Sequence, residues 1–171
     1  KSNWRDKMIK LRYPNPDDAE RFYEILNDVD SKYYYATIPD SIEMEREWIK
    51  KRKYKRNNNK EYNYAVILKE EIVGGCSITI NQDYTHIGEF GYFVDPACSG
   101  QGIATRTVEK LESIAYDVLN LNRFEIKMDP RHKASERVAI KNNYIKEGLL
   151  HNVVKFNGSY YNYLLYAKTK K

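Results

Sequence analysis

The chain has 171 residues, of which 42% are hydrophobic and 13% aromatic, enough to bury the core of one domain. Two cysteines cannot form a disulfide framework, no apolar run approaches the ~20 residues of a membrane span, and the first residues are too charged for a secretory signal. The net charge of +5 favours acidic partners but is too small to decide the function. We expect one cytoplasmic domain over residues 1–171, in which residues 1–7 are a disordered or added lead.

The N-terminal part reads as a strand followed by two helices. Residues 8–13 alternate as a strand does, and residues 14–18 then supply a turn and an N-cap for a helix over residues 19–26. A second helix is expected from Ser41, because acidic residues occupy its first turns and lysines follow them. This helix should end in the basic run at residues 50–56.

Three strands come next. Residues 62–68 and 72–80 are apolar-rich and flank Lys69-Glu70-Glu71, which predicts a hairpin. Residues 87–94 form the third strand of this group, and the three strands should pair antiparallel in sequence order.

A glycine loop, Ser99-Gly100-Gln101-Gly102, then opens directly into a helix whose apolar residues recur at steps of three and four from Ala104 to Val118. Glycine lets the backbone approach an anion closely, and the first turn of a helix points unpaired N–H groups at the same spot. The pattern predicts a phosphate cradle. The loop has neither the spacing of a nucleotide-triphosphate P-loop nor that of a dinucleotide-binding loop, so another phosphate-bearing ligand is needed.

The C-terminal part returns to strands. Residues 123–128 alternate as a strand does, and residues 134–144 have helical spacing. The last segment is a hairpin, because residues 153–156 and 160–167 flank Asn157-Gly158, a strong hairpin signal.

This order of elements, with the glycine loop in its middle, resembles the GNAT superfamily of acetyl-CoA-dependent N-acetyltransferases over nearly the whole chain. The branch of ribosomal-protein N-terminal acetyltransferases reads G-Y-x-[LV]-x-P and then R-G-x-G-[IL]-[AG]-T, which is similar to GYFVDP at residues 91–96 and SGQGIAT at residues 99–105. Ser99 stands where Gln or Arg is usual. The resemblance implies an α/β (α+β) fold with a central mixed, mostly antiparallel sheet of about six or seven strands and about four helices. It implies acetyl-CoA as cofactor, no metal, and a set of cofactor-binding residues: Phe93, Val94, Ser99, Gly100, Gln101, Gly102, Ile103, Ala104, His132 and Ser135.

The resemblance also implies catalytic roles. Acetyl transfer from a thioester requires a group that accepts the amine proton, a donor to the oxyanion and a group that assists the departing thiolate. Glu89 occupies the place from which this branch often supplies the base, although a strand glutamate is as often simply solvated. The N–H of Val94 is implied as the oxyanion donor, with an ordinary sheet hydrogen bond as the alternative.

Two residues are candidates for the acid. Ser135 matches the family, and its alternative role is an N-cap. The family's usual tyrosine falls on Ala139, which leaves Tyr144 as the acid suggested by chemistry alone, with core packing as its alternative. His132, which replaces a family asparagine, is either a contact for the cofactor phosphates or a solvated loop histidine.

The acceptor is expected to be a primary amine, on a protein N-terminus or a small molecule. In the family the loop between the first two helices walls the acceptor pocket, and here that loop contains Tyr33, Tyr34 and Tyr35. These tyrosines, with Glu89, are the candidate substrate-binding residues, and loop packing is their alternative. A second function class is a noncatalytic module on the same scaffold, which the departures at Ala139 and His132 leave open. Such a module would sense CoA, or bind nucleic acid through the basic run at residues 50–56. A solvated helix end and attraction of an acidic protein acceptor are other interpretations of this run. No membrane partner is expected, nucleic acid is disfavoured, and a homodimer is compatible with the resemblance.

Overall fold

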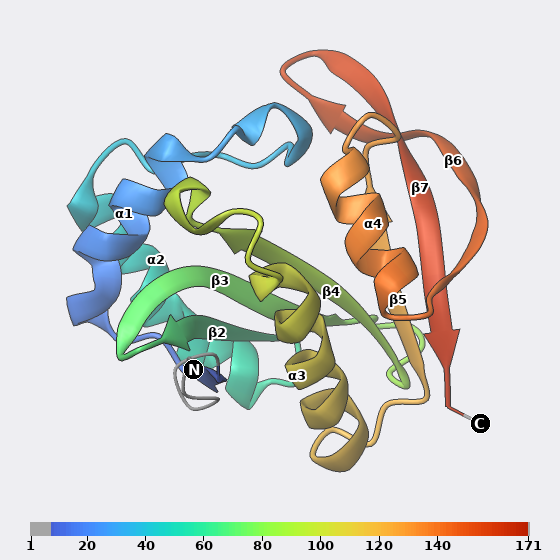
Figure 1. Cartoon of the computed structure of the whole chain (residues 1–171), viewed down its shortest axis with the longest axis horizontal. Coiled ribbons are helices and arrows are strands. Elements are labelled where there is room, and N and C mark those ends of the chain that lie inside the picture. Colours follow the sequence, from blue (N-terminus) through green and yellow to red (C-terminus); the bar gives the residue numbers. More distant parts are fainter. Residues whose placement is uncertain (1–7, 171) are drawn as a thin grey trace.

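The computed structural model describes residues 8–170, so the lead expected at residues 1–7 lies outside the described residues. The described chain forms a seven-stranded sheet in the order β1-β2-β3-β4-β5-β7-β6, in which every neighbouring pair is antiparallel except β4 and β5 (Figure 1). The predicted fold is confirmed. The strands are β1 (Ile9–Arg12), β2 (Glu61–Leu68), β3 (Glu71–Ile80), β4 (Ile87–Val94), β5 (Arg123–Met128), β6 (Ile145–Phe156) and β7 (Ser159–Thr169). The α-helices are α1 (Ala19–Asp28), α2 (Ile42–Asn57), α3 (Ile103–Asp117) and α4 (Lys133–Lys141).

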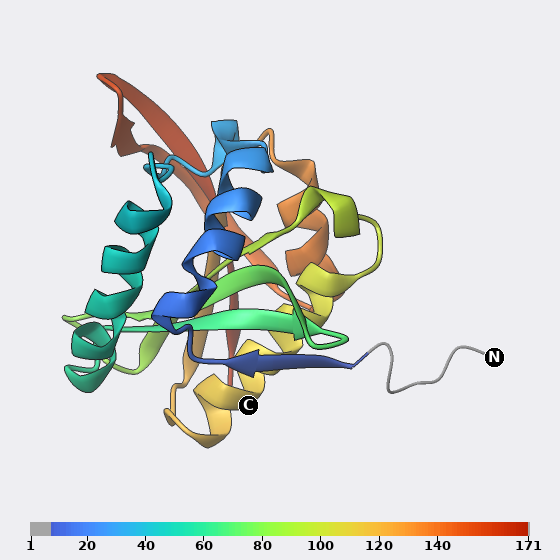
Figure 2. The ribbon, with the colours of Figure 1, turned by 90° about the vertical axis from the view of Figure 1, so that its left-hand side faces the viewer.

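Helices cover both faces of the sheet. On one face α1 and α2 lie side by side and bury Phe22, Ile25 and Ile49 against the sheet (Figure 2). On the other face α3 and α4 bury their apolar stripes against a larger core that includes Val66 of β2. Because side chains alternate across a strand, consecutive residues of β2 contribute to the two cores in turn. None of the described helices combines the length and apolarity that crossing a membrane requires.

Local signals set most element bounds. The Ser41 side chain accepts a hydrogen bond from the Met44 N–H at 3.0 Å, which confirms the predicted start of α2. The β2–β3 turn consists of Lys69 and Glu70, both with positive φ, as a tight two-residue hairpin requires. Asn157-Gly158 makes the equivalent turn between β6 and β7.

Some bounds differ from the sequence prediction. The basic run lies within α2, and α4 ends at Lys141 because Asn143 adopts a left-handed φ of 63°. Strand β6 begins at Ile145, well before the predicted residue 153. The sequence did not indicate this earlier part because most of its residues are exposed and show no clear alternation of apolar and polar side chains. Val118, expected on the apolar face of α3, is its exposed C-cap.

The close approach of β3 and β4 requires glycine at residue 74. A Cβ atom there would lie 2.3 Å from the Phe93 carbonyl oxygen, so Gly74→Ala must displace the β4 backbone. We expect this variant to lose ~1–3 kcal/mol of unfolding free energy, because overpacking on backbone cannot relax by a rotamer change. Thermal unfolding should show a decrease in Tm of roughly 2–12 °C.

The matched control is Gly75→Ala, whose Cβ would meet the far end of the Phe93 ring at 2.6 Å. A ring can rotate away more readily than a strand can move, so this control should lose less stability. Equal losses in the two variants would contradict the interpretation of Gly74 as a backbone constraint.

Candidate active site

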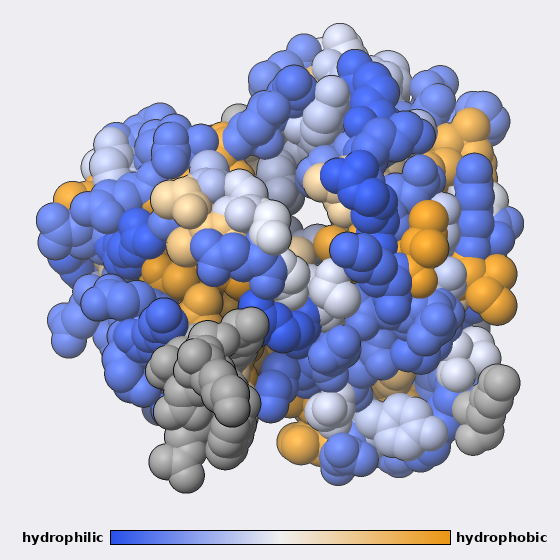
Figure 3. Space-filling view, in the orientation of Figure 1, coloured by the Kyte–Doolittle hydropathy of each residue, from blue (hydrophilic) through white to orange (hydrophobic). Residues whose placement is uncertain are grey.

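Strands β4 and β5 begin as parallel neighbours and then separate. Among the described residues they pair from Ile87 with Arg123 to Glu89 with Glu125, although both strands continue beyond these residues. The separation leaves a cavity of about 170 Å³ between the two strands, the splay cavity. In the orientation of Figure 1, the molecular surface is hollowed between the end of β4 and α4 (Figure 3).

The amide of Val94 faces this separation. The next residue, Asp95, donates its N–H to the Val73 carbonyl of β3 at 2.8 Å. Successive amides of an extended strand point to opposite edges, so the N–H of Val94 points away from β3 and toward β5. Past Glu89 the described β5 no longer pairs with β4. The geometry therefore fits the donor role that the sequence analysis gave to Val94.

The glycine loop has the form expected of an anion cradle. Gly100 and Gly102 have φ of 76° and 73°, and a Cβ on either residue would meet nothing within 4 Å. Gly102 is the N-cap of α3, so the free N–H groups of the first helical turn open beside this space. The hydroxyl and the backbone N–H of Ser99 both donate to the Pro96 carbonyl, so the N–H groups open to a ligand are those that follow Ser99. These features fit a phosphate-bearing cofactor.

Arg106, in the first turn of α3, contacts this loop and is not among the residues that the sequence motifs single out. Its guanidinium donates to the Gln101 carbonyl at 2.8 Å and to the Gly102 carbonyl at 3.3 Å. The side chain thus fixes the loop carbonyls and adds a positive charge beside the cradle. The only signal of this contact in the sequence is the position of an arginine one helical turn after Gly102.

Ser135 and Tyr92 meet in the splay cavity. The Ser135 hydroxyl lies 2.8 Å from the Tyr92 hydroxyl, and both residues line the cavity. Ser135 is in the first turn of α4 but is not its N-cap, which is His132. Burial raises the pKa of Tyr92, although its hydrogen bond with Ser135 opposes that rise, so the phenol stays protonated. From the sequence, Tyr92 stands out only as part of the GYFVDP motif.

Glu89 lines the same cavity, and it is the last residue of β4 that pairs with β5. Its side chain is 40% exposed and accepts a hydrogen bond from the Lys127 ammonium at 2.9 Å. A ligand amine entering the cavity would therefore meet a carboxylate that already holds one cation.

Two of the three adjacent tyrosines also line the splay cavity. Tyr33 and Tyr34 contact the His132 ring, with centroid distances of 5.5 and 5.3 Å. Burial lowers the pKa of His132, although nearby Asp129 and Asp30 oppose that effect. The uncharged imidazole is a weaker partner for phosphate than a cation, and its contact with the cofactor phosphates stays a prediction.

Tyr35 has a different role in the structure. Its hydroxyl donates a short hydrogen bond to buried Asp129, and its ring stacks on Tyr161 of β7 at 4.4 Å. Burial and the bond to Asp129 raise the pKa of Tyr35 to about 12, while the Arg131 guanidinium opposes the rise. Tyr35 lines neither the splay cavity nor the larger cavity described next, and it anchors the α1–α2 loop to the β6–β7 hairpin.

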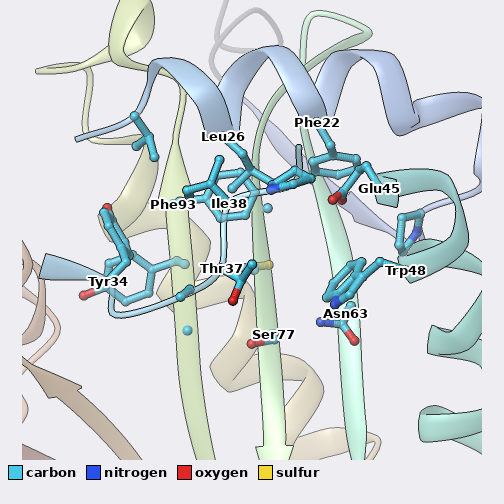
Figure 4. Close-up of a pocket in the computed structure, with 18 of the residues that line it drawn as sticks. Phe22, Leu26, Tyr34, Thr37, Ile38, Glu45, Trp48, Asn63, Ser77 and Phe93 are labelled. Atoms are coloured by element: carbon cyan, nitrogen blue, oxygen red, sulfur yellow. The ribbon is translucent and has the colours of Figure 1, made fainter. Parts of the chain in front are cut away.

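A larger cavity of about 480 Å³ lies between α1, α2 and the sheet, the acceptor cavity (Figure 4). Its walls are mostly apolar and aromatic, and Phe22, Trp48 and Phe93 are among them. It shares Tyr34, Gly91 and Tyr92 with the splay cavity, so the two spaces meet at the middle of β4. An amine held in the larger space can therefore approach groups in the smaller one.

Tyr144 lies outside both the splay cavity and the acceptor cavity. Its ring is in the core beneath α3 and α4, and its buried hydroxyl has no hydrogen-bond partner among the described residues. Burial, and then the charge of Glu112, raise the pKa of Tyr144. The residue lines neither cavity, so the structure does not bring it to Glu89 or Ser135.

The basic run is partly occupied by intramolecular contacts. Arg52 is buried with its guanidinium over the Trp48 ring at 4.0 Å, and Arg56 lies over the Tyr13 ring at 3.8 Å. Lys50 pairs with Glu47 at 2.7 Å. Fewer charges are therefore available to a polyanion than the sequence suggests.

Comparison with known proteins agrees with this geometry. Residues 9–144 match the acetyltransferase (GNAT) domain family. Over 168 residues the chain is 25% identical to the uncharacterized N-acetyltransferase p20 of Bacillus licheniformis, with 96% of this chain and 94% of that protein covered. It is 29% identical over 105 residues to the ribosomal-protein-serine acetyltransferase of Escherichia coli strain K12, covering 61% of this chain and 59% of that protein.

A solved structure shares the fold. It is the microcin C7 self-immunity acetyltransferase MccE in complex with acetyl-CoA and AMP, which aligns with a TM-score of 0.84 at 24% identity. The alignment covers 95% of this chain and 92% of that one.

Proposed function

The chain belongs to the GNAT acetyltransferase family, and we propose that it transfers the acetyl group of acetyl-CoA to a primary amine by direct attack within a ternary complex. The observation that carries this proposal is the separation of β4 and β5. Glu89 and Ser135 line the resulting cavity with a carboxylate and a hydroxyl, and the amide of Val94 at the end of β4 points into the same separation. These are the acceptor and donor groups that acetyl transfer needs.

As a GNAT acetyltransferase, the protein uses acetyl-CoA, which supplies an activated acyl group and a thiolate leaving group. The open backbone at Gly100 and Gly102 and the start of α3 would hold its phosphates, with Arg106 adding charge beside them. This assignment relies on backbone groups, so serine at residue 99 in place of the usual Gln or Arg does not prevent it.

The residues around the splay cavity would then act in successive steps of the reaction. Glu89 receives the proton of the attacking amine, directly or through a water molecule, once the amine has replaced Lys127 as its partner. The Val94 N–H donates to the carbonyl oxygen as negative charge develops there. The C–S bond then breaks, and the Ser135 hydroxyl donates a hydrogen bond to the departing thiolate while Tyr92 holds that hydroxyl in position. Tyr144 takes no part in these steps, because its side chain lies in the core.

The acceptor class includes protein N-termini and small amines. The Escherichia coli relative is named for acetylating a serine of ribosomal protein, which supports a protein N-terminus. The mostly apolar acceptor cavity supports a small molecule. Membership of an acetyltransferase family favours the enzyme over a noncatalytic binding module, and a cytoplasmic location stays part of the proposal.

The proposal is tested by thermal unfolding with and without acetyl-CoA, followed by thiol release with amines and N-terminal peptides. Acetyl-CoA at 100 times its Kd should add about 2.7 kcal/mol of stability, or roughly 5–10 °C in Tm. Thiol release that depends on the acceptor would then support transfer. Absence of both effects would refute the proposed function.

The hydroxyl pair gives a sharper prediction. Ser135→Ala should lower kcat by ~10²-fold if Ser135 assists the leaving thiolate. Tyr92→Phe, which keeps the ring but removes the hydroxyl at 2.8 Å, should lower kcat by a smaller factor. In the double variant the loss should not exceed that of Ser135→Ala alone, because Tyr92 acts through Ser135.

Steady-state kinetics check this double-mutant cycle. The KM for acetyl-CoA and the Tm should stay near their wild-type values if the two hydroxyls serve the chemical step. Additive losses in the double variant would separate Tyr92 from Ser135.

A further inference from the structure

Two buried oxygen acceptors line the acceptor cavity at the end formed by α2 and β2. Glu45 is 5% exposed and Asn63 is 7% exposed. Among residues 8–170, the buried Oδ1 of Asn63 accepts no hydrogen bond. Glu45 lines the cavity, and the only charge in that part of the chain that acts on its carboxylate is that of Arg52. Figure 4 shows both residues with Trp48 at the opposite end of the cavity from Tyr34. Buried acceptors without donors are unfavourable, so this end is suited to a ligand that donates.

The nearest cation is committed to other groups. Arg52 donates to the Trp48 carbonyl at 3.2 Å, stacks over the Trp48 ring and lies 3.6 Å from Glu61. Glu61 in turn accepts from the amide nitrogen of Asn63 at 2.8 Å, which turns the free oxygen of that amide to other partners. Burial raises the pKa of Glu45, and the charge of Arg52 only partly offsets this. A bound cation would compensate the buried charge of Glu45.

The strand register gives the backbone distance from this end to the place where the two cavities meet. Asn63 of β2 is opposite Ser77 of β3, and Ser77 is opposite Gly91 of β4. Neighbouring strands lie about 4.8 Å apart, so Asn63 and Gly91 are separated by about 10 Å across the sheet. Gly91 lines both cavities, at the point where an acceptor amine would pass into the splay cavity.

We propose that the acceptor is a small amphipathic diamine in which an apolar spacer of about 10 Å separates the acetylated nitrogen from a second ammonium, which binds Glu45 and Asn63. The inference rests on the proposed function and names its substrate class. The apolar walls fit the spacer, and the carboxylate with the amide oxygen fits the ammonium. The volume of about 480 Å³ is that of a small-molecule site.

Heptane-1,7-diamine and heptylamine test this assignment, because they share one spacer and differ only in the second nitrogen. We expect wild-type kcat/KM to be higher for the diamine by ~10-fold or more, since the second contact is a charge-assisted hydrogen bond. Glu45→Gln should abolish most of this preference, whereas Glu45→Asp, which keeps the charge, should retain much of it. The matched control is Glu43→Gln, because Glu43 is exposed on the same helix, pairs with Arg46 and lies outside the cavity.

Calorimetric titration of the diamine into the protein with CoA present gives a readout that does not need turnover. Binding that weakens in Glu45→Gln but not in Glu43→Gln would support the subsite even if no acetylation were detected, and the proposed function would then fail alone. Equal kcat/KM for the two amines in the wild type would overturn the subsite while acetyl transfer stood. A preference for N-terminal peptides that Glu45→Gln leaves unchanged would overturn the diamine as occupant.

Discussion

Replacing Gly102 with glutamate is expected to lower the affinity for acetyl-CoA by about 10²-fold or more. The new side chain would enter the open space over the glycine loop and place a negative charge at the start of α3. That charge would replace an attraction for phosphate of up to ~2 kcal/mol with a repulsion of similar size. Since about 1.4 kcal/mol corresponds to a factor of ten, a combined change of ~3–4 kcal/mol lowers the affinity by roughly two to three orders of magnitude. Isothermal titration with CoA measures the effect directly.

Backbone strain must be separated from this effect. Gly102 has a φ of 73°, which is unfavourable for any other residue by ~1–2 kcal/mol, so the variant will also lose stability. Gly158 has a φ of 78° in the β6–β7 turn, also with open space around it, and Gly158→Glu imposes the same strain away from the loop. This control should lose stability but retain CoA affinity. Wild-type affinity in a folded Gly102→Glu variant would remove the loop from the cofactor site.

The sequence was sufficient for elements whose signals are local. The predicted bounds of β4 and β5 coincide with the structure because each is an alternating run closed by a turn residue. The glycine loop was identifiable because left-handed φ at Gly100 and Gly102 is a property of the loop itself. The start of α2 followed from one residue, Ser41, which caps it.

Contacts between distant segments could not be predicted in this way. Tyr92 and Ser135 are 43 residues apart, and only the packing of α4 beside β4 brings their hydroxyls together. Tyr35 was grouped with its two neighbours, yet its left-handed φ of 48° turns it toward Asp129, which is 94 residues away. Tyr144 was considered as an acid because of its chemistry, and the structure buries it in the core. Side-chain type alone does not determine which face of the fold a residue reaches.

Glu89→Gln is expected to lower kcat by ~10²-fold or more, because the amide cannot accept the proton of the attacking amine. The substitution keeps the size of the side chain, and Glu89 is not part of the glycine loop, so acetyl-CoA binding should be unchanged. The loss should shrink as pH rises, since a larger fraction of the free acceptor is then already deprotonated. Thiol release across a pH series measures both effects.

Glu125→Gln is the matched control for this prediction. Glu125 pairs directly with Glu89 in the sheet register and lies 4.0 Å from the same Lys127 ammonium, but its carboxylate is held by Arg123 at 2.9 Å and lies outside the splay cavity. It therefore shares the local charge environment of Glu89 without facing the acceptor. If both variants lose activity equally, the loss reflects disruption of the charge cluster around Lys127; if only Glu89→Gln loses activity, the carboxylate of Glu89 is the group that accepts the proton.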